Sequence, residues 1–291
     1  MSRARLTLPR WALLLSVLAG GTQAALGQAT RPAPAATPAD IHAGVNETLV
    51  DSSIPADAAV EKMLTVYAPK VRALDEVIGR LKGDLKKGGI GSGSLGNFVT
   101  DGIRSEAGSR LGKPIVLAVT NSGGLRKSVI PEGDLHVRDI FELMPFENAL
   151  VAFDLTGEQV LKLLRVVVSY RDAQSGARIK YRIGANKKPE LEQARLLIDR
   201  QEKEIDPAAT YTVISIDYLW KRRSTTPSET EGNYSVLGEA KDIRPLGLSI
   251  RDALINYVKA ETAADRDIKS TLDGRFVFDK AASGGAEEPK P

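Results

Sequence analysis

The sequence predicts an α+β fold, or an irregular mixed α/β sheet flanked by helices. Three observations point to it. Residues 115–119 read Ile-Val-Leu-Ala-Val, a short apolar run typical of a buried strand. Residues 156–170 combine a capping signal with apolar residues at helical spacing, which indicates an amphipathic helix. Further strand-like and helix-like segments follow without strict alternation, which favours a mixed sheet over a regular βαβ array.

The N-terminal end has the pattern of a secretory signal peptide, over residues 1–29. Arg3, Arg5 and Arg10 form the positive region, residues 11–20 are apolar, and small residues suited to cleavage follow. We therefore expect a periplasmic or secreted protein. An uncleaved N-terminal anchor is the alternative.

Composition divides the rest of the chain into three parts. Residues 30–45 are rich in Ala, Pro and Thr and are expected to form an extended linker. Residues 282–291 are small, charged and proline-containing, and are expected to be a disordered tail. Between them we predict one domain, over residues 46–281. The hydrophobic content of the chain, 42%, is ordinary for a globular protein and predicts a sizeable core.

The formal net charge of +3 belongs to the signal segment, because residues 1–29 contain three arginines and no Asp or Glu. The remaining chain is neutral, which gives no support for nucleic-acid binding. The chain has no cysteine, so no disulfide can form and the fold must rest on its core. No apolar run approaches twenty residues, so no membrane-spanning helix is expected.

The first half of the domain is expected to begin with a helix. Residues 55–70 place apolar side chains on one face at helical spacing: Ala59, Val60, Met63, Leu64 and Tyr67. Residues 74–85 mix apolar and charged residues, and either a strand or a helix fits them. After a Gly-rich turn, Ser94 is the expected N-cap of a helix that runs to about Ala107. Three polar side chains share one narrow stripe of that helix: Asn97, Asp101 and Arg104.

The second half of the domain continues with both kinds of element. Residues 150–155 alternate as a strand does, and Thr156 then caps a helix, with Gln159 at the capping-box position. The side chains of this helix expected to face the core are Leu161, Leu164, Val167 and Val168. Short strands are expected at residues 178–183, 194–199 and 211–217, and a final amphipathic helix at residues 248–260.

The most informative segment follows the apolar run at residues 115–119. Residues 121–126 read Asn-Ser-Gly-Gly-Leu-Arg, and consecutive glycines let a ligand approach the backbone because no Cβ intervenes. Arg126 offers a planar fork of donors that matches a phosphate or a carboxylate. Residues 145–148 (Pro-Phe-Glu-Asn) place the Phe146 ring on a turn, as a stacking ring for a flat heterocycle would be placed. Taken singly, each segment is more often a plain turn or a core ring; together they suggest a site for an aromatic group that carries an anion, as in a nucleotide.

Four segments, in order, resemble the C-terminal, substrate-binding domain of the 5'-nucleotidase family. They are residues 96–104 (Gly-Asn-Phe-Val-Thr-Asp-Gly-Ile-Arg), the loop at 121–126, the stretch from Gly-Asp to Pro-Phe-Glu-Asn at 133–148, and Leu-Thr-Gly at 155–157. A weaker match runs from about residue 55 to about residue 260. The resemblance implies the fold of that domain, a mixed sheet flanked by helices.

The resemblance also implies a substrate-binding site on this chain. It assigns phosphate binding to Arg126 and Arg104, and it makes Phe146 the first of two rings that sandwich a base. Tyr234 is the candidate second ring, and Asn233 stands where the family has an aspartate that contacts ribose. The implied substrate-binding residues are Arg104, Asn121, Gly123, Gly124, Arg126, Phe146, Asn148, Asn233 and Tyr234.

Two departures from the family pattern concern the ligand more than the fold. Ser122 replaces the first loop glycine, and Glu147 replaces the glycine that follows Phe146. A carboxylate beside the stacking ring is expected to repel a phosphate or to select a different base.

The metal chemistry of the resembled family is missing from the sequence. Full-length members carry an N-terminal metallophosphoesterase domain, which holds two metal ions. This chain has only His42 and His136, and neither has neighbours with metal-ligand spacing. The residues before 55 are too few to form such a domain. We therefore expect no catalytic residue, metal or cofactor on this chain, and divalent metals on a partner.

These inferences leave three functional hypotheses. The first is the substrate-recognition subunit of a split nucleotidase, assembled in the periplasm with a separately encoded metallophosphoesterase chain. The second is a stand-alone binding protein for a nucleotide or a nucleotide sugar. The third is a relic that kept the fold and lost the ligand, which the departures at Glu147 and Asn233 favour slightly.

Overall fold

The computed structural model describes residue 44 and residues 47–221, 234–285 and 287–288. The chain divides into two compact units, Met1–Pro55 and Ala56–Pro291. All helices and strands named below lie in the second unit. The expected signal peptide lies outside the described residues. Within the described ranges, no helix is both long and apolar enough to cross a bilayer.

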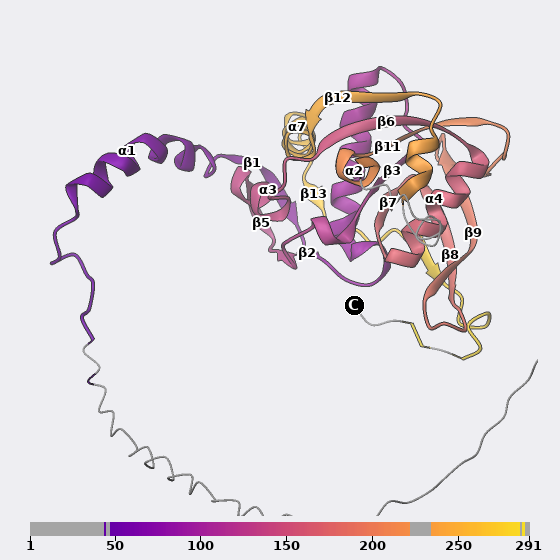
Figure 1. The fold of residues 1–291 in the computed structure, drawn as a ribbon, viewed down its shortest axis with the longest axis horizontal. Helices are drawn as coiled ribbons and strands as arrows, with labels where there is room; N and C mark the ends of the chain where they lie inside the picture. The colour runs from indigo at the N-terminus through magenta and orange to yellow at the C-terminus, as the bar shows by residue number, and fades with distance from the viewer. Residues whose placement is uncertain (1–43, 45–46, 222–233, 286, 289–291) are drawn as a thin grey trace, which may run out of the picture. The chain divides into compact units, whose positions relative to one another are not determined.

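A five-stranded mixed sheet forms the centre of the domain (Figure 1). Its strands in spatial order are β12 (Ile243–Ser249), β6 (Ala149–Thr156), β11 (Thr210–Ile216), β3 (Leu117–Thr120) and β7 (Ala173–Ser175). Pairing is parallel between β11 and β3 and antiparallel at the other contacts. All residues of β3 are buried, and because successive side chains point to opposite faces, both faces of the sheet are covered there. The predicted mixed α+β fold is confirmed.

Smaller sheets extend the domain on either side. A four-stranded sheet has the order β10 (Gln201–Glu204), β9 (Pro189–Ile198), β8 (Ala177–Ile183) and β14 (Phe276–Phe278). A three-stranded sheet has the order β13 (Ile268–Lys269), β1 (Val77–Lys82) and β5 (Gly133–His136), and a strand pair joins β2 (Leu85–Lys86) to β4 (Val129–Ile130). The ambiguous stretch at residues 74–85 is therefore extended over most of its length.

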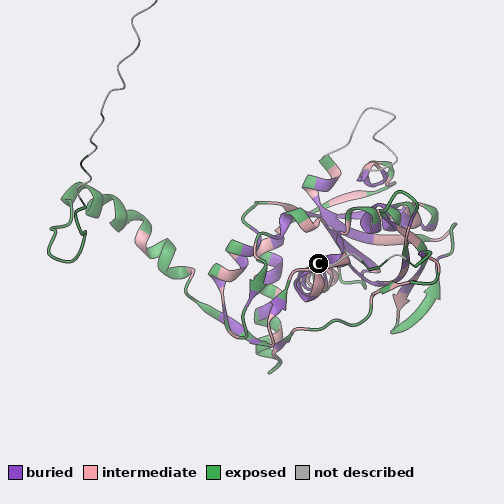
Figure 2. Ribbon diagram, turned by 90° about the horizontal axis from the view of Figure 1, so that it is seen from below, coloured by how far each residue is buried: buried purple, intermediate pink, exposed green. Residues whose placement is uncertain are grey.

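Three long helices build the core with these sheets: α2 (Gly93–Leu111), α4 (Gly157–Tyr170) and α7 (Ile250–Ala263). α2 packs against β3 and β7, whereas α4 packs against β6 and against β9 of the second sheet. α2 and α7 approach each other closely at Gly102, where an added Cβ would lie 2.8 Å from Leu254 Cδ2. Figure 2 shows long stretches of the central strands, and bands along the packed helices, as buried. The buried apolar side chains form one core cluster.

The helix starts test the capping predictions. At α4, Thr156 Oγ1 accepts from the Gln159 amide at 3.3 Å and Gln159 Oε1 accepts from the Thr156 amide at 2.9 Å, so the predicted capping box is confirmed. At α2, the expected N-cap Ser94 lies inside the helix, and Ser92 at a φ of 61° precedes it. The Ser94 hydroxyl instead accepts from the Lys86 amide at 2.9 Å, which ties α2 to β2.

The predicted first helix is also confirmed, as α1 (Ala58–Ala73). The Asp57 carboxylate caps it by accepting from the amides of Ala59 and Val60. No residue of α1 is buried, and its apolar face is exposed along its length (Figure 2). This helix therefore contributes little to the core.

Five short helical elements complete the described part of the fold. They are η1 (Ile90–Ser92), η2 (Ser122–Gly124), α3 (Val137–Leu143), α5 (Asp217–Lys221) and η3 (Tyr234–Glu239).

Candidate ligand-binding site at the glycine loop

The glycine loop, residues 121–126, leaves the buried end of β3 and turns at once. Asn121 is extended, and η2 then closes through hydrogen bonds from the Gly124 amide to the Asn121 carbonyl (3.1 Å) and from the Leu125 amide to the Ser122 carbonyl (3.1 Å). Leu125 is buried at 1% exposure and anchors the turn in the core. The Arg126 amide donates to the Leu143 carbonyl at 2.8 Å, and its side chain is exposed. The loop thus holds a rigid backbone and presents a cation to solvent.

Gly124 lies at the tightest point of the loop. A Cβ at this buried position would lie 3.3 Å from Asn121 Oδ1 and 3.5 Å from Met144 Cε. Asn121 Oδ1 is itself buried and accepts no hydrogen bond within the described part of the chain. Gly123, in contrast, is exposed. Asn121 therefore carries an unsatisfied acceptor beside an open stretch of backbone.

Phe146 and Arg126 come together as the sequence suggests. The Arg126 guanidinium lies over the Phe146 ring, 5.1 Å from its centroid, and the ring is 42% exposed. Glu147 forms an ion pair with Arg251 at 3.1 Å, so its negative charge is partly offset. Asn148 accepts from the Ile250 amide with its backbone carbonyl at 2.9 Å. The expected repulsion by Glu147 is therefore weaker than its position in the sequence implies.

Lys87 is a cation of this region that the sequence analysis missed. Its ammonium donates to the Leu125 carbonyl at 2.9 Å, and its amide donates to the Ser128 carbonyl at 2.8 Å. Burial and the nearby Arg126 lower the pKa of Lys87, and the charge of Asp172 opposes that shift. The only sequence signal was a lysine pair in front of the Gly-rich turn at residues 88–93.

Asp172 is a second residue that the sequence analysis missed. Its side chain is 5% exposed; Oδ1 accepts from the Ser122 amide at 2.7 Å and Oδ2 accepts from the Tyr234 hydroxyl at 2.6 Å. Burial raises the pKa of the Asp172 carboxyl to about 6, although the bonds from Tyr234 and Ser122 act to lower it. A lone aspartate after a helix carries no pattern that predicts these contacts.

Tyr234 does not present the open ring that the family resemblance implies. It is 6% exposed, and burial raises the pKa of its hydroxyl well above the ordinary value. Its ring stacks on Tyr170, with centroids 6.5 Å apart, and Tyr170 is 53% exposed. The structure therefore brings Tyr234 to the glycine loop through Asp172, with its ring covered. Asn233 lies outside the described residues.

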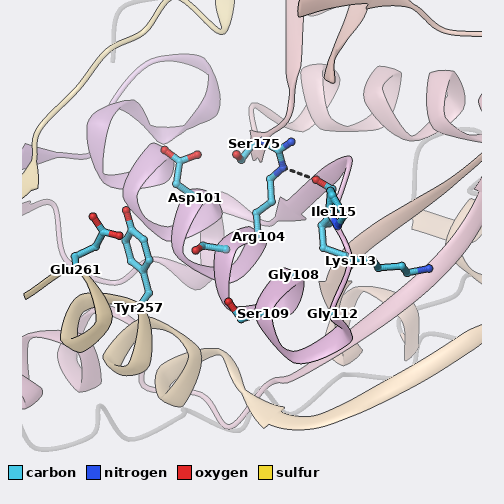
Figure 3. Close-up of a pocket in the computed structure, with 12 residues that line it drawn as sticks. Asp101, Arg104, Gly108, Ser109, Gly112, Lys113, Ile115, Ser175, Tyr257 and Glu261 are labelled. Carbon is cyan, nitrogen blue, oxygen red and sulfur yellow. Dashed lines mark hydrogen bonds between the residues drawn. The ribbon is translucent and has the colours of Figure 1, made fainter. Parts of the chain in front are cut away.

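The structure does not bring Arg104 to the glycine loop. Its Nε donates to the Ile115 carbonyl at 2.7 Å, as Figure 3 shows, and its Nη2 donates to the Leu197 carbonyl at 3.4 Å. Ile115 precedes β3 and Asn121 follows it, so about 20 Å of extended chain separates the two points. Arg104 instead lines a polar hollow of about 760 Å³ beside α2 and α7 (Figure 3). Burial lowers the pKa of Arg104, and its bonds to two carbonyls are those of a structural arginine.

The residues that the structure describes do not form a two-metal centre. In the described ranges, no group of three or more His, Cys, Asp or Glu side chains is placed to hold a metal ion. His136 stands at the start of α3, where its Nδ1 lies 3.5 Å from Asp139 Oδ2 and its amide donates to the same carboxylate. His42 lies outside the described residues.

Comparison with known proteins identifies the family. Residues 76–226, more than half of the chain, match the family model of the 5'-nucleotidase C-terminal domain. The chain belongs to the 5'-nucleotidase C-terminal domain family. It is 37% identical to the trifunctional nucleotide phosphoesterase YfkN of Bacillus subtilis over 101 residues, covering 33% of this chain and 7% of YfkN. It is 28% identical to the protein UshA of Yersinia enterocolitica, over 57% of this chain and 29% of UshA.

A solved structure supports the same assignment. The 5'-nucleotidase precursor of Thermus thermophilus aligns with a TM-score of 0.60 and 25% identity, covering 76% of this chain and 43% of that protein. The family resemblance and the fold expected from it are both confirmed. The chain spans less than a third of the length of the curated relatives it matches.

Proposed function

We propose that this chain is the nucleotide-recognition domain of a 5'-nucleotidase-type phosphoester hydrolase. It would act in nucleotide catabolism in the periplasm, together with a separately encoded metallophosphoesterase chain that supplies divalent metals and the hydrolytic chemistry. Membership of the 5'-nucleotidase C-terminal domain family supports the class of ligand. The signal-like N-terminal sequence supports the compartment.

One observation carries the proposal: Arg126 of the glycine loop lies against the partly exposed ring of Phe146. Arg126 supplies a donor fork for phosphate, and Phe146 supplies a half-open ring for a base. Lys87 adds a second positive charge behind the loop. Asn121 stays in the proposed set because of the family resemblance; its unpaired side-chain oxygen is buried and is not open to a ligand in this conformation.

The proposed binding set follows from these placements. It keeps Asn121, Gly123, Gly124, Arg126, Phe146 and Asn148, adds Lys87, and retains Asn233 as a ribose contact. Tyr234 would support the site from behind, since its ring is covered. We assign Arg104 a structural role, because its hydrogen bonds to Ile115 and Leu197 both go to backbone carbonyls.

The test is isothermal titration of the purified chain with AMP, adenosine and UDP-glucose, beside a phosphate-release assay with added Mn²⁺. We expect AMP to bind more tightly than adenosine and no phosphate to be released by the chain alone. Phosphate release would contradict the proposal that the catalytic centre lies on a partner. No binding to any of the three compounds would contradict nucleotide recognition by the isolated chain and would favour the relic.

A stand-alone nucleotide or nucleotide-sugar binding protein is the second candidate. The observation in its favour is that Lys87, Arg126 and Phe146 are already in place on one chain. The same titration separates the candidates when it is repeated with the neighbouring metallophosphoesterase chain, where the genome encodes one. Phosphate release by the mixture supports the split hydrolase, whereas tight binding without release supports the stand-alone protein.

A further inference from the structure

One buried carboxylate lies behind the glycine loop and joins two distant parts of the chain. The two oxygens of Asp172 accept from the Ser122 amide at 2.7 Å and from the Tyr234 hydroxyl at 2.6 Å. These partners lie 50 and 62 residues away in sequence. A single side chain therefore connects η2, which forms the glycine loop, to η3.

Arg171, the residue before Asp172, connects a third segment, η1, to the glycine loop. Arg171 ends α4 in the left-handed conformation at a φ of 59°, which turns its carbonyl toward the loop region. That carbonyl accepts from the Ser122 hydroxyl at 2.9 Å and from the Gly91 amide at 3.3 Å, and the hydroxyls of Ser92 and Ser122 are in contact. The C-terminal end of α4 thus fixes η1, η2 and η3 together.

The hydrogen bonds of Asp172 can fix the conformation of the glycine loop in addition to packing it. A buried carboxylate loses its hydration, and it is tolerated only when it is hydrogen-bonded or paired. A loop with two adjacent glycines loses more conformational freedom on ordering than other loops do, so it needs fixed partners to hold one conformation. Asp172 meets that need at the amide that begins the turn of η2.

We propose that Asp172 is a positioning residue, which holds the glycine loop in its ligand-binding conformation by accepting from the Ser122 amide and the Tyr234 hydroxyl with the two oxygens of one carboxylate. Asp172 acts through the loop and does not touch the ligand. The nature of the ligand rests on the proposed function; the hydrogen bonds do not.

The surroundings of the carboxylate make its ionisation measurable. The titratable and charged groups that act on it are Tyr234 of η3 and Lys87 before η1. Tyr170 at the end of α4 acts in turn on Tyr234, and Arg126 acts on Lys87. The pKa of Asp172 is raised to about 6 by burial, within the range where folded proteins are readily studied. The Ser122 amide, bonded to this carboxylate, reports its charge directly.

The first experiment needs no ligand. In the ¹⁵N-labelled full chain, the amide shift of Ser122 is followed between pH 4.5 and 7.5, and amide exchange is measured across residues 121–126. We expect one titration near pH 6 in the wild type, its loss in Asp172→Asn, and loop exchange roughly tenfold faster in that variant because the bond from Ser122 loses its charged acceptor. A Ser122 shift that titrates identically in both proteins would overturn the proposal.

The second experiment measures AMP affinity in a graded series. We expect a roughly tenfold loss in Asp172→Asn and a larger loss in Asp172→Ala, which removes both acceptors. Asp154→Asn is the matched control, because Asp154 also accepts from a hydroxyl and from Arg244 but lies at the β6–β11–β12 contact. It should leave the affinity within about twofold.

The outcomes separate the two proposals. If the wild type binds no AMP, the proposed function fails, and faster loop exchange in Asp172→Asn alone still supports positioning. If Asp172→Asn binds AMP as tightly as the wild type and its loop exchanges no faster, the positioning role is wrong. Should the Asp172 variants not fold, Tyr234→Phe removes one of the two bonds and keeps the buried ring; unchanged affinity and unchanged loop exchange in that variant would also overturn the proposal.

Discussion

At the scale of single residues, Arg126 and Phe146 are expected to read different parts of a nucleotide. Arg126→Ala should weaken AMP binding by about 2–3 kcal/mol, because it removes a charge-assisted contact to phosphate, and should leave adenosine nearly unchanged. Phe146→Ala should weaken both compounds by roughly 1–3 kcal/mol, because both carry a base that can stack. Calorimetric titration of each variant measures these losses, with the exposed Arg80→Ala as control.

The contrast between the two ligands decides the interpretation. If Arg126→Ala weakened the affinities for AMP and adenosine equally, Arg126 would not contact the phosphate. A Phe146→Ala variant that unfolds would show that the ring serves the core, although 42% of it is exposed.

Asp172 is expected to favour ligand binding and, at neutral pH, to lower the free energy of unfolding. Its pKa is raised by burial from 3.8 to about 6, so between these values the folded protein binds more protons than the unfolded chain. The stability that this group contributes is complete below pH 3.8 and is lost as the pH rises through 6, a change of about 3 kcal/mol. Asp172→Asn should therefore exceed the wild type in unfolding free energy at pH 7 and lose this advantage near pH 4, as measured by urea denaturation at both values.

This result would also validate the binding experiment. A variant that gains stability at pH 7 and still binds its ligand less tightly cannot owe the loss to unfolding. A variant less stable than the wild type at pH 7 would contradict the raised pKa.

At the scale of elements, the same substitution is expected to act in opposite directions in two helices. Gly157 begins α4 where an added Cβ would lie 2.0 Å from the Asp206 carbonyl oxygen, so Gly157→Ala should destabilise the domain by roughly 1–3 kcal/mol. In α2, the nearest atom to a Cβ on Gly108 is the Lys113 carbonyl oxygen at 3.4 Å, so Gly108→Ala should stabilise it by up to about 1 kcal/mol. Urea midpoints measure both changes. If both variants were destabilised, the stabilising effect of helix propensity at Gly108 would be wrong; if both were stabilised, the close packing at Gly157 would be wrong.

Local patterns explain which elements the sequence could predict. The Thr156–Gln159 capping box and the apolar run before Asn121 are short-range signals, and both elements form where they indicate. The proximity of Arg126 and Phe146 follows from chemistry: one segment offers a donor for an anion and the other a ring for a heterocycle, and one nucleotide carries both groups. Asp172 was missed because its partners are 50 and 62 residues away, and no periodicity records such a contact.

The same limit explains the outcome for two predicted site residues. Arg104 shares a helix stripe with Asn97 and Asp101, yet the direction of α2 relative to β3 places it at the far end of the strand from the loop. Tyr234 follows a polar segment, and only the fold shows that its ring is covered and its hydroxyl is bonded to Asp172.

At the scale of the whole molecule, the described part of the domain is well packed around its sheets, whereas the helix α1 buries none of its residues. The apolar side chains of α1 remain exposed: Val60, Met63, Leu64, Val66, Tyr67 and Val71. The matched family domain begins at residue 76, just after this helix. In the proposed split hydrolase, the catalytic partner would cover this exposed apolar face of α1.

This difference predicts unequal protection from amide exchange. A helix of 16 residues is marginal in water without tertiary contacts, and Pro69 removes one of its hydrogen bonds. In the isolated chain we therefore expect the amides of α1 to exchange at least about a hundredfold faster than those of the buried α2, as followed by mass spectrometry. Adding the metallophosphoesterase chain should slow α1 selectively and leave α2 unchanged. Protection of α1 equal to that of α2 in the isolated chain would show that its apolar face is already packed, on this domain or on a second copy, and would leave no open face for a partner.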